Sequence, residues 1–330
     1  MKINSLGEFG LIDRIAAGVK QSPGVAIGIG DDAAATTATP GTVTLVTSDM
    51  LVERVHFDFD FCDPVVLGRK ALSVNLSDVA AMGGRPRFFL LSLAIPPHFP
   101  VEAIDGFTRG LLQRAEEFGV TLVGGDTCAS RGDLVISITL LGEQLPELVI
   151  RRSGARPGDL VCLTGEVGES ALGLELLRRG ERSGWAIDRH LDPFPRVREG
   201  LLLANAKIVS AMIDVSDGLL ADLGHILKQS GVGARLGAGS IPCSDRFRDA
   251  CRHAGEDPLQ LSLAGGEDYE LLFTIPPEAH QAAVEMLSET GAPLSVIGEV
   301  TTEEGLSVFD RNGLPYPVRF RGFDHFSPQE

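Results

Sequence analysis

The stretch PVVLGRKALSVNLSDVAAMGGRPRFFLLSLAIPP, residues 64–97, places a helix directly before a strand. Its first part has apolar residues at helical spacing, with Pro64 near the start and Gly83 and Gly84 as a stop signal. Its last part, RFFLLSLAIPP, is an apolar run that predicts a strand. The stretch therefore predicts a fold that mixes helices and strands.

The same alternation extends on both sides of this stretch. GTVTLVTSDM, residues 41–50, alternates as a strand and is expected to deliver Ser48 and Asp49 at its C-terminal end. The helix predicted in EFGLIDRIAA, residues 8–17, has an apolar face of Phe9, Ile12, Ile15 and Ala16. Downstream, the pattern predicts a helix at 101–119 and strands at 120–126 and 133–143.

A domain boundary is predicted at RRSGARPGDLVCLTG, residues 151–165, where an irregular basic segment precedes a Pro-Gly turn and a new strand. The second half repeats the alternation, with helices at 169–180, 217–231 and 277–291 and strands at 268–277 and 294–300. We therefore predict two domains of α/β or α+β type, at residues 1–148 and 149–330. The first is expected to contain a mixed sheet with helices, and the second an α/β arrangement.

The composition limits the classes of partner. Of the 330 residues 44% are hydrophobic, and 45 acidic residues against 29 basic ones give a net charge of −16. This charge disfavours nucleic acids and anionic membranes, and a polyanionic substrate requires cations to bind. The five cysteines form no C-x-x-C pair and are odd in number, which favours a reducing compartment. With no signal peptide or long apolar run, the expected location is the cytoplasm, with no membrane partner.

Aspartates recur beside small residues in five short segments. GIGDDAAATT (28–37), TSD, NLSD, GGDT and DVSDG contain Asp31, Asp32, Asp49, Asp78, Asp126, Asp214 and Asp217. Each of them is expected at a turn, at a strand end or on a helix flank. Magnesium prefers carboxylate, hydroxyl and water oxygens and takes one or two carboxylates per ion beside a phosphate. Seven aspartates therefore suit several ions around a polyphosphate.

The ordinary interpretation of each segment is a turn or a helix cap, because Asp-Gly, Gly-Asp and Ser-Asp pairs are common there. For one segment alone that interpretation is favoured. For five together, a shared ligand role is favoured, because turns and caps would more often use asparagine, serine or threonine.

Other phosphate-binding devices are absent from the sequence. It has no Gly-Lys pair and hence no P-loop, and GIGDDA lacks the third glycine of a dinucleotide fingerprint. It has neither the kinase set H-R-D and D-F-G nor an H-E-x-x-H zinc motif. Metal ions would therefore have to neutralise any bound phosphate.

Seven motifs together resemble one family. GIGDDAA, TSDMLVERVHF, KALSVNLSDVAAMGG, GGDT, RSGARPGD, DVSDGLLADLGHI and GGEDYELLF occur in the order found in the thiamine-monophosphate kinase family, part of the aminoimidazole ribonucleotide synthetase superfamily of ATP-using enzymes. The resemblance runs from Glu8 to Phe326. The acidic segments resemble motifs found across the superfamily. VHF, DVSDGLLADLGHI and GGEDYEL resemble motifs specific to its thiamine-phosphate branch.

The resemblance implies a reaction and a set of site residues. The family transfers the γ-phosphoryl group of ATP directly to thiamine monophosphate, with magnesium. Positions matching its magnesium ligands are Asp32, Thr47, Ser48, Asp49, Asp78, Asp126, Asp214 and Asp217. Positions matching its ATP contacts are Gly125, Asp126, Arg152 and Ser216. Positions matching its thiamine monophosphate contacts are His56, Glu267 and Phe323.

The resemblance also implies an architecture. The first domain would bind ATP and magnesium and pair its sheet with that of a second copy in a homodimer. The second domain would complete the active site. Because catalysis by aligned phosphates and metal ions needs no dedicated general base, no catalytic side chain is assigned.

Four of these residues have alternative roles. Arg152 offers a fork suited to phosphate oxygens but is equally interpreted as a solvated charge beside Arg151. Glu267 could bond the aminopyrimidine or offset the thiazolium charge, or be a turn acid. His56 is by itself an ordinary strand histidine, and Phe323 an ordinary core aromatic.

Three positions depart from the family pattern. Arg54 stands where the family often has glycine, and Gly84 where alanine is common. Phe323 replaces a tyrosine or tryptophan, which keeps stacking but loses a polar contact. Of the two adjacent aspartates in GIGDDA, Asp32 is the predicted magnesium ligand and Asp31 is the weaker candidate.

Two rival classes remain. An ATP-dependent synthase that activates an amide or carbonyl oxygen would share the acidic segments. Selenophosphate synthetase needs a reactive residue near the N-terminus, where the first cysteine here is Cys62, and the hydrogenase-maturation dehydratase needs a C-terminal cysteine, where this sequence reads FSPQE. A binding protein without activity is disfavoured by the intact set of acids.

Overall fold

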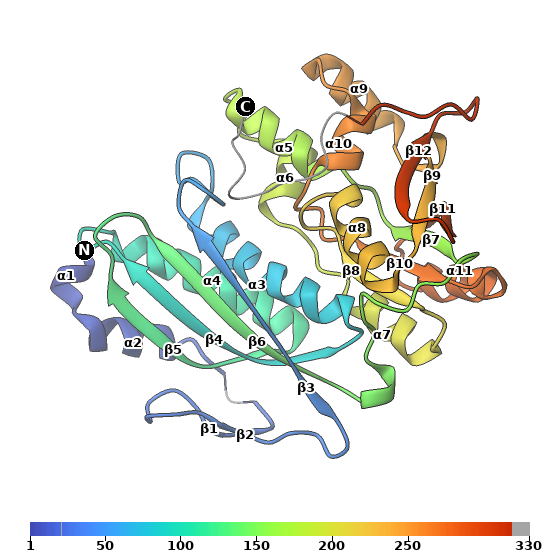
Figure 1. Ribbon diagram of the computed structural model, residues 1–330. Helices are drawn as coiled ribbons and strands as arrows, with labels where there is room; N and C mark the ends of the chain where they lie inside the picture. Colours follow the sequence, from blue (N-terminus) through green and yellow to red (C-terminus); the bar gives the residue numbers. More distant parts are fainter. Residues whose placement is uncertain (21, 319–330) are drawn as a thin grey trace. The chain divides into compact units, whose positions relative to one another are not determined.

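The computed structural model describes residues 1–20 and 22–318 (Figure 1). The chain divides into two compact units: unit 1 comprises residues 1–79 and 84–147, and unit 2 comprises residues 80–83 and 148 onward. Among the described residues, no helix is both long and apolar enough to span a bilayer.

Unit 1 is built on a four-stranded sheet in the order β3-β6-β4-β5. Strands β3, β6 and β4 are antiparallel neighbours, and β4 and β5 are parallel. Its elements are α1 (Ile3–Leu6), α2 (Glu8–Ala16), β1 (Val25–Ile27), β2 (Ala35–Thr36), β3 (Val43–Val52), α3 (Pro64–Ala81), β4 (Arg85–Ile95), α4 (Val101–Phe118), β5 (Thr121–Ala129) and β6 (Val135–Gln144). In Figure 1 the four strands lie in front of α3 and α4, which cover one face of the sheet.

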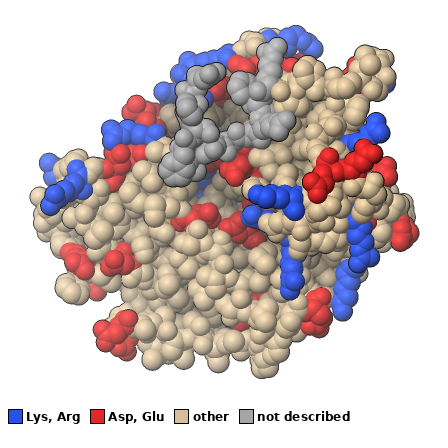
Figure 2. Space-filling model, in the orientation of Figure 1, with Lys and Arg blue, Asp and Glu red and all other residues tan. Residues whose placement is uncertain are grey.

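The two faces of this sheet differ in burial, because successive residues of a strand point to opposite sides. Leu45 and Leu51 of β3 point to the face that α3 and α4 cover and are buried. Val46 and Met50 of the same strand point to the other face and are 65% and 57% exposed. We call this second side the open face. The surface over the strands is mostly uncharged in Figure 2.

Helices α3 and α4 approach each other closely at two glycines. A Cβ atom on Gly68 would lie 2.0 Å from the carbonyl oxygen of Phe107, and one on Gly110 would lie 1.8 Å from that of Val65. No side chain fits at such distances, so the helix crossing requires glycine at both positions. This crossing fixes α3, and with it Asp78, against the sheet.

Unit 2 is built on a six-stranded sheet in the order β12-β9-β11-β7-β10-β8, antiparallel except for the β12–β9 pair. Its strands are β7 (Leu160–Thr164), β8 (Ala211–Asp214), β9 (Gly233–Gly237), β10 (Leu271–Ile275), β11 (Leu294–Thr301) and β12 (Gly305–Phe309). Its helices are α5 (Glu169–Arg178), α6 (Trp185–Leu191), α7 (Val197–Ala206), α8 (Leu219–Ser230), α9 (Asp245–Ala254), α10 (Pro258–Ala264) and α11 (His280–Ser288). Short 3-10 helices lie at Ala238–Ser240 and Pro277–Ala279. A third, Pro146–Leu148, lies where unit 1 ends.

The core of unit 2 packs α8 against the sheet. Leu219, Leu223 and Ile226 of α8 are fully buried and belong to one apolar cluster with Val161 of β7 and Leu272 of β10. This packing fixes the N-terminal end of α8 beside the end of β8, which is where the DVSDG segment lies.

The mixed α/β architecture is the one expected, and the predicted helices and strands of both halves are present. Three details were wrong. Ser48 and Asp49 lie inside β3, because the strand continues to Val52, and Asp126 lies inside β5. Phe9 is 79% exposed, and the buried residues of α2 are instead Leu11 and Ile15. Four helices and three strands of unit 2 were not predicted from the sequence, namely α6, α7, α9, α10, β8, β9 and β12.

Candidate functional site

Three predicted ligands of unit 1 meet on the helix-covered face of the sheet. The Thr47 hydroxyl donates a hydrogen bond to the Asp78 carboxylate on α3. Asp49, two residues further along β3, points to the same face. Burial, and then the charge of Asp78, raise the pKa of Asp49 to about 7. Two carboxylates and a hydroxyl are therefore placed where a cation would relieve an unfavourable charge.

Two other predicted ligands of unit 1 lie on the open face. Ser48 shares a hydrogen bond of 3.0 Å with the Thr139 hydroxyl of β6. Asp126 is exposed and is paired in register with Ser92 of β4. Its neighbour Gly125 has no space for a side chain, because a Cβ there would lie 1.8 Å from a carbonyl oxygen of β4.

The GIGDD segment and the turn after β3 are surface structures. Asp31 and Asp32 are exposed, and the Asp31 carboxylate accepts the N–H of Asp32 at 3.2 Å. His56 Nδ1 accepts the N–H of Val52 at 3.0 Å, which folds the turn back on the strand. Arg54 in this turn has φ of 64°, a conformation that glycine adopts without strain. The glycine that the family resemblance led us to expect at this position would therefore fit this conformation.

In unit 2, the DVSDG segment is organised by Asp222 on the first turn of α8. One carboxylate oxygen of Asp222 accepts the N–H groups of Ser216, Asp217 and Gly218 at 3.0, 3.1 and 3.1 Å. Burial and the nearby Asp217 raise the pKa of Asp222 to about 7. Ligand atoms of Asp217, Asp222 and His225 lie within 4.8 Å of one another. Neither Asp222 nor His225 was predicted from the sequence as a site residue, although acids in the first turn of a helix are a recognisable capping signal.

The GGEDYE segment runs beside the DVSDG segment. The N–H of Glu267 donates to the Ser216 carbonyl at 2.8 Å, and the N–H of Tyr269 donates to the Val215 carbonyl at 2.8 Å. A Cβ on Gly266 would lie 2.3 Å from the Ser216 carbonyl oxygen, so this approach requires glycine. The structure therefore brings together Ser216, predicted to contact ATP, and Glu267, predicted to contact thiamine monophosphate.

Glu267 has two further features. Its φ is 63°, a left-handed conformation that is uncommon for a residue with a side chain. Its carboxylate lies 3.3 Å from His190 Nδ1, which is also 3.1 Å from the Ser170 hydroxyl. His190 and Ser170 are buried, so the position of Glu267 is determined by groups inside unit 2.

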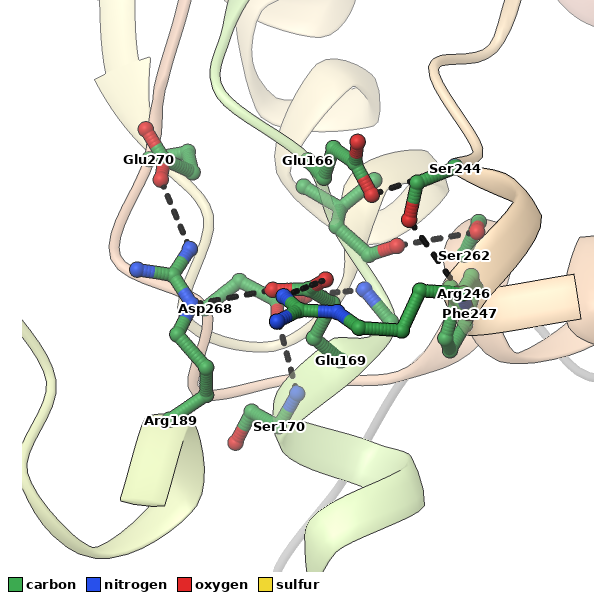
Figure 3. Close-up of polar contacts among 12 residues, drawn as sticks. Glu166, Glu169, Ser170, Arg189, Ser244, Arg246, Phe247, Ser262, Asp268 and Glu270 are labelled. Atoms are coloured by element: carbon green, nitrogen blue, oxygen red, sulfur yellow. Dashed lines mark hydrogen bonds and ion pairs between the residues drawn. The ribbon is translucent and has the colours of Figure 1, made fainter. Parts of the chain in front are cut away.

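Asp268 caps helix α5 (Figure 3). Its carboxylate accepts the N–H of Gly168 at 2.6 Å and that of Ser170 at 3.2 Å. Burial raises the pKa of Asp268 to about 7, although these two hydrogen bonds oppose the shift. Asp268 is therefore a structural acid of the motif.

Glu270 is the centre of a buried ion-pair network. It accepts from Arg189 Nη2 at 2.9 Å, from Arg196 Nε and Nη2 at 2.7 Å each, and from the Thr164 hydroxyl at 2.7 Å. Figure 3 shows Arg189 between Glu270 and the start of α5. Two of the four polar residues of GGEDYE thus hold the segment in place, and Glu267 beside them carries a predicted substrate contact.

Two of the remaining predicted residues lie in unit 2. Asp214 is buried at the end of β8, and Arg152 is exposed in the irregular segment before β7. Phe323 lies outside the residues that the structure describes. The donor chemistry of the predicted ligands, carboxylate and hydroxyl oxygens, fits a hard cation such as Mg²⁺.

Two family models match the chain. AIR synthase related protein, N-terminal domain, matches residues 30–144, and AIR synthase related protein, C-terminal domain, matches residues 156–311. The thiamine-monophosphate kinase of Escherichia coli K12 is 39% identical over 331 residues, covering 97% of this chain and 98% of that protein. The thiamine-monophosphate kinase of Bacillus subtilis 168 is 34% identical over 329 residues, covering 97% of this chain and 100% of that protein.

Solved structures agree with these relatives. Thiamine-monophosphate kinase from Stenotrophomonas maltophilia K279a has a TM-score of 0.82 at 36% identity, covering 92% of this chain and 96% of its own. AaThiL complexed with AMPPCP and TMP has a TM-score of 0.78 at 33% identity, covering 99% of both chains. A hydrogenase maturation protein, HypE, has a TM-score of 0.78 at 21% identity, which shows a shared fold alone. The chain belongs to the thiamine-monophosphate kinase family.

Proposed function

We propose that this chain transfers the γ-phosphoryl group of ATP to thiamine monophosphate and so forms thiamine diphosphate and ADP, the last step in making thiamine diphosphate. The observation that carries this proposal is the likeness, over 99% of both chains, to a structure that contains an ATP analogue and TMP. The arrangement of DVSDG beside GGEDYE supports it, because residues predicted to contact the two substrates lie on hydrogen-bonded neighbouring segments.

The transfer needs no proton movement by the protein. A phosphate oxygen of thiamine monophosphate, already ionised near neutral pH, forms a bond to the γ-phosphorus. The bond between that phosphorus and the β–γ bridging oxygen breaks, and ADP leaves with the electron pair. The chain then contributes alignment and charge neutralisation, the main sources of catalysis in phosphoryl transfer.

We propose that several Mg²⁺ ions bind at the positions that match the family's ligands: Asp32, Thr47, Ser48, Asp49, Asp78, Asp126, Asp214 and Asp217. Bound Mg²⁺ would offset the repulsion between the triphosphate of ATP and the phosphate of thiamine monophosphate. Gly125, Asp126, Arg152 and Ser216 are proposed to contact ATP, and His56 and Glu267 thiamine monophosphate. The Glu267 carboxylate contacts the buried His190 ring, so its negative charge can lie in a fixed position for the cationic substrate.

We also propose that the chain acts as a homodimer that pairs the open faces of unit 1. The apolar side chains of Val46 and Met50 are exposed there, and pairing would remove them from water. Size-exclusion chromatography with light scattering checks this, with about 70 kDa expected for two chains of 35.0 kDa each.

The reaction is tested by incubation with γ-labelled ATP, Mg²⁺ and thiamine monophosphate. Labelled thiamine diphosphate is expected. Label released only as inorganic phosphate would favour a synthase that activates another oxygen, and no turnover by folded protein would favour a binding protein.

The Asp49→Asn variant tests the proposed ligands of unit 1. Turnover should be lost while the melting temperature without metal is not lowered, because the Asp49 charge is disfavoured by burial and by Asp78. Asp245→Asn is the control, because the Asp245 side chain is 93% exposed. This variant should keep the wild-type turnover and the wild-type melting temperature. A variant Asp49→Asn that melts well below the wild type would make Asp49 a structural residue.

A further inference from the structure

Helix α6 is joined to the GGEDYE segment by two consecutive residues. Arg189 Nη2 donates to Glu270 at 2.9 Å, and Nδ1 of His190 lies 3.3 Å from the Glu267 carboxylate. The side chains of Glu270 and His190 are buried, whereas that of Glu267 is 27% exposed. The first contact therefore ends at an acid inside unit 2, and the second ends at a carboxylate that a ligand can reach.

The crossing of α5 and α6 holds His190 in place. A Cβ on Gly173 of α5 would lie 2.1 Å from a carbonyl oxygen of α6, so the two helices require glycine at this contact. The Ser170 hydroxyl of α5 lies 3.1 Å from His190 Nδ1. The Ser170 N–H in turn donates to the Asp268 carboxylate at 3.2 Å (Figure 3). The buried His190 ring is therefore fixed between α5 and Glu267.

The two oxygen atoms beside His190 Nδ1 decide which ring nitrogen carries the proton. A neutral imidazole has one N–H, and its other nitrogen presents a lone pair. An unprotonated Nδ1 would aim this lone pair at the Glu267 carboxylate, which only accepts when it is ionised. A protonated Nδ1 meets a charged acceptor there, and such hydrogen bonds are stronger than those between neutral groups. The arrangement therefore favours a proton on Nδ1, donated to Glu267 rather than to the neutral Ser170 hydroxyl.

The backbone of Glu267 is fixed separately from its side chain. Its φ of 63° is uncommon for a residue with a side chain, and such conformations persist where the surrounding structure determines them. The N–H of Glu267 donates to the Ser216 carbonyl at 2.8 Å. The backbone is thus fixed against the DVSDG segment, and the contact with His190 sets the direction of the carboxylate.

We propose that His190 is a positioning residue of the thiamine monophosphate site, whose Nδ1–H holds the Glu267 carboxylate in the direction that meets the cationic substrate. This inference rests on the proposed kinase function and on the proposed contact between Glu267 and thiamine monophosphate. His190 acts through Glu267, so its loss should weaken the binding of thiamine monophosphate and leave that of ATP unchanged.

Steady-state kinetics of single variants test this role. His190→Leu removes the donor, so the KM for thiamine monophosphate should rise about three- to tenfold, the range for one lost hydrogen bond of ordinary strength. The KM for ATP should not change. In His190→Asn the amide nitrogen takes the place of Nδ1 and can donate to Glu267, so the KM for thiamine monophosphate should stay within about twofold of the wild-type value.

Ser170→Ala is the matched control. It removes the other neighbour of His190 Nδ1 and leaves the contact with Glu267, so the KM for thiamine monophosphate should equal that of the wild type. A rise as large as that of His190→Leu would show that any damage between α5 and α6 has this effect, and would refute the role of His190. An unchanged KM in folded His190→Leu would refute it too.

The double variant His190→Leu/Glu267→Gln shows whether the two residues act together. Residues that act through one contact are not additive, so the rise in the KM for thiamine monophosphate should be smaller than the product of the two single rises. A rise equal to that product would mean that His190 does not act through Glu267. A wild-type protein that does not phosphorylate thiamine monophosphate would instead refute the proposed function.

Nitrogen NMR gives a readout that does not depend on activity. The chain has seven histidines, and in protein labelled with ¹⁵N-histidine the ring signals of His190 are those that His190→Asn lacks. Long-range proton–nitrogen correlations distinguish a protonated ring nitrogen from an unprotonated one and should show the proton on Nδ1. An unprotonated Nδ1 with the proton on Nε2 would overturn the proposal, whether or not His190→Leu folds.

Discussion

Replacement of Glu270 by glutamine tests whether the buried network holds unit 2 together. Each carboxylate oxygen accepts from two donors: one from Arg189 and Arg196, the other from Arg196 and Thr164. Whichever oxygen becomes the amide nitrogen, at least one arginine N–H then faces a donor, because Arg196 contacts both oxygens. The Glu270 side chain is 1% exposed, so water cannot replace the lost acceptor.

The expected loss follows from the burial of the charges. Removing one partner of a buried ion pair costs about 3–5 kcal/mol, and the conservative Glu270→Gln change should lie at the lower end, about 3 kcal/mol. For a unit of this size, about 2–4 °C of melting temperature corresponds to 1 kcal/mol. The predicted decrease is therefore about 6–12 °C.

Differential scanning calorimetry without ligands at pH 7.5 provides the measurement, and Asp245→Asn provides the control. Asp245 pairs with Arg248 at 2.9 Å, but its side chain is 93% exposed, so its loss should cost at most about 0.5 kcal/mol. If Glu270→Gln shifts the melting temperature no more than Asp245→Asn does, the network does not stabilise the unit and the reasoning is wrong.

Three further predictions concern pH, packing and substrate binding. Burial raises the pKa of Asp268 from 3.8 to about 7, so the folded state holds a proton that the unfolded state has lost, and the free energy of unfolding should fall as the pH rises from 3.8 to about 7. In Asp268→Asn the melting temperature should therefore depend less on pH over this range. Parallel curves of melting temperature against pH for the variant and the wild type would contradict this. Gly110→Ala should reduce the free energy of unfolding by about 1–3 kcal/mol or more, and lower the melting temperature accordingly. The reason is that the added Cβ would lie 1.8 Å from the Val65 carbonyl oxygen. Gly224→Ala, with open space around its Cβ, should raise the melting temperature slightly. Glu267→Gln should raise the KM for thiamine monophosphate about tenfold and leave the KM for ATP unchanged, and steady-state kinetics with each substrate varied would show whether it does.

Much of the fold was predictable because local patterns act within single elements. The spacing in residues 64–81 determined helix α3, and the alternation in 43–52 determined strand β3. The helices and strands missed in unit 2 are short, and their apolar residues are buried by neighbours distant in sequence. Phe9 shows the same limit: the pattern placed it on the apolar face of α2, but in the folded chain Phe9 is exposed and Leu11 and Ile15 are buried.

The residue types of the candidate site were also readable from the sequence. Aspartates beside small residues predicted a hard-cation and phosphate chemistry, and the ordered motifs indicated the family. The structural roles of Asp222 and Glu270 were not predicted, because they arise from contacts made only in the folded chain. One example is the set of three hydrogen bonds that Asp222 accepts from backbone N–H groups.

The sequence by itself determined the helices and strands with strong periodicity, the acidic chemistry and the family. Only the tertiary structure decided where each acid points. Asp49 and Asp126 appear in the sequence as equivalent members of one ligand set, yet strand order and register place them on opposite faces and edges of one sheet. The physical reason is that side-chain direction alternates with every residue of a strand, while strand order depends on packing between segments distant in the chain.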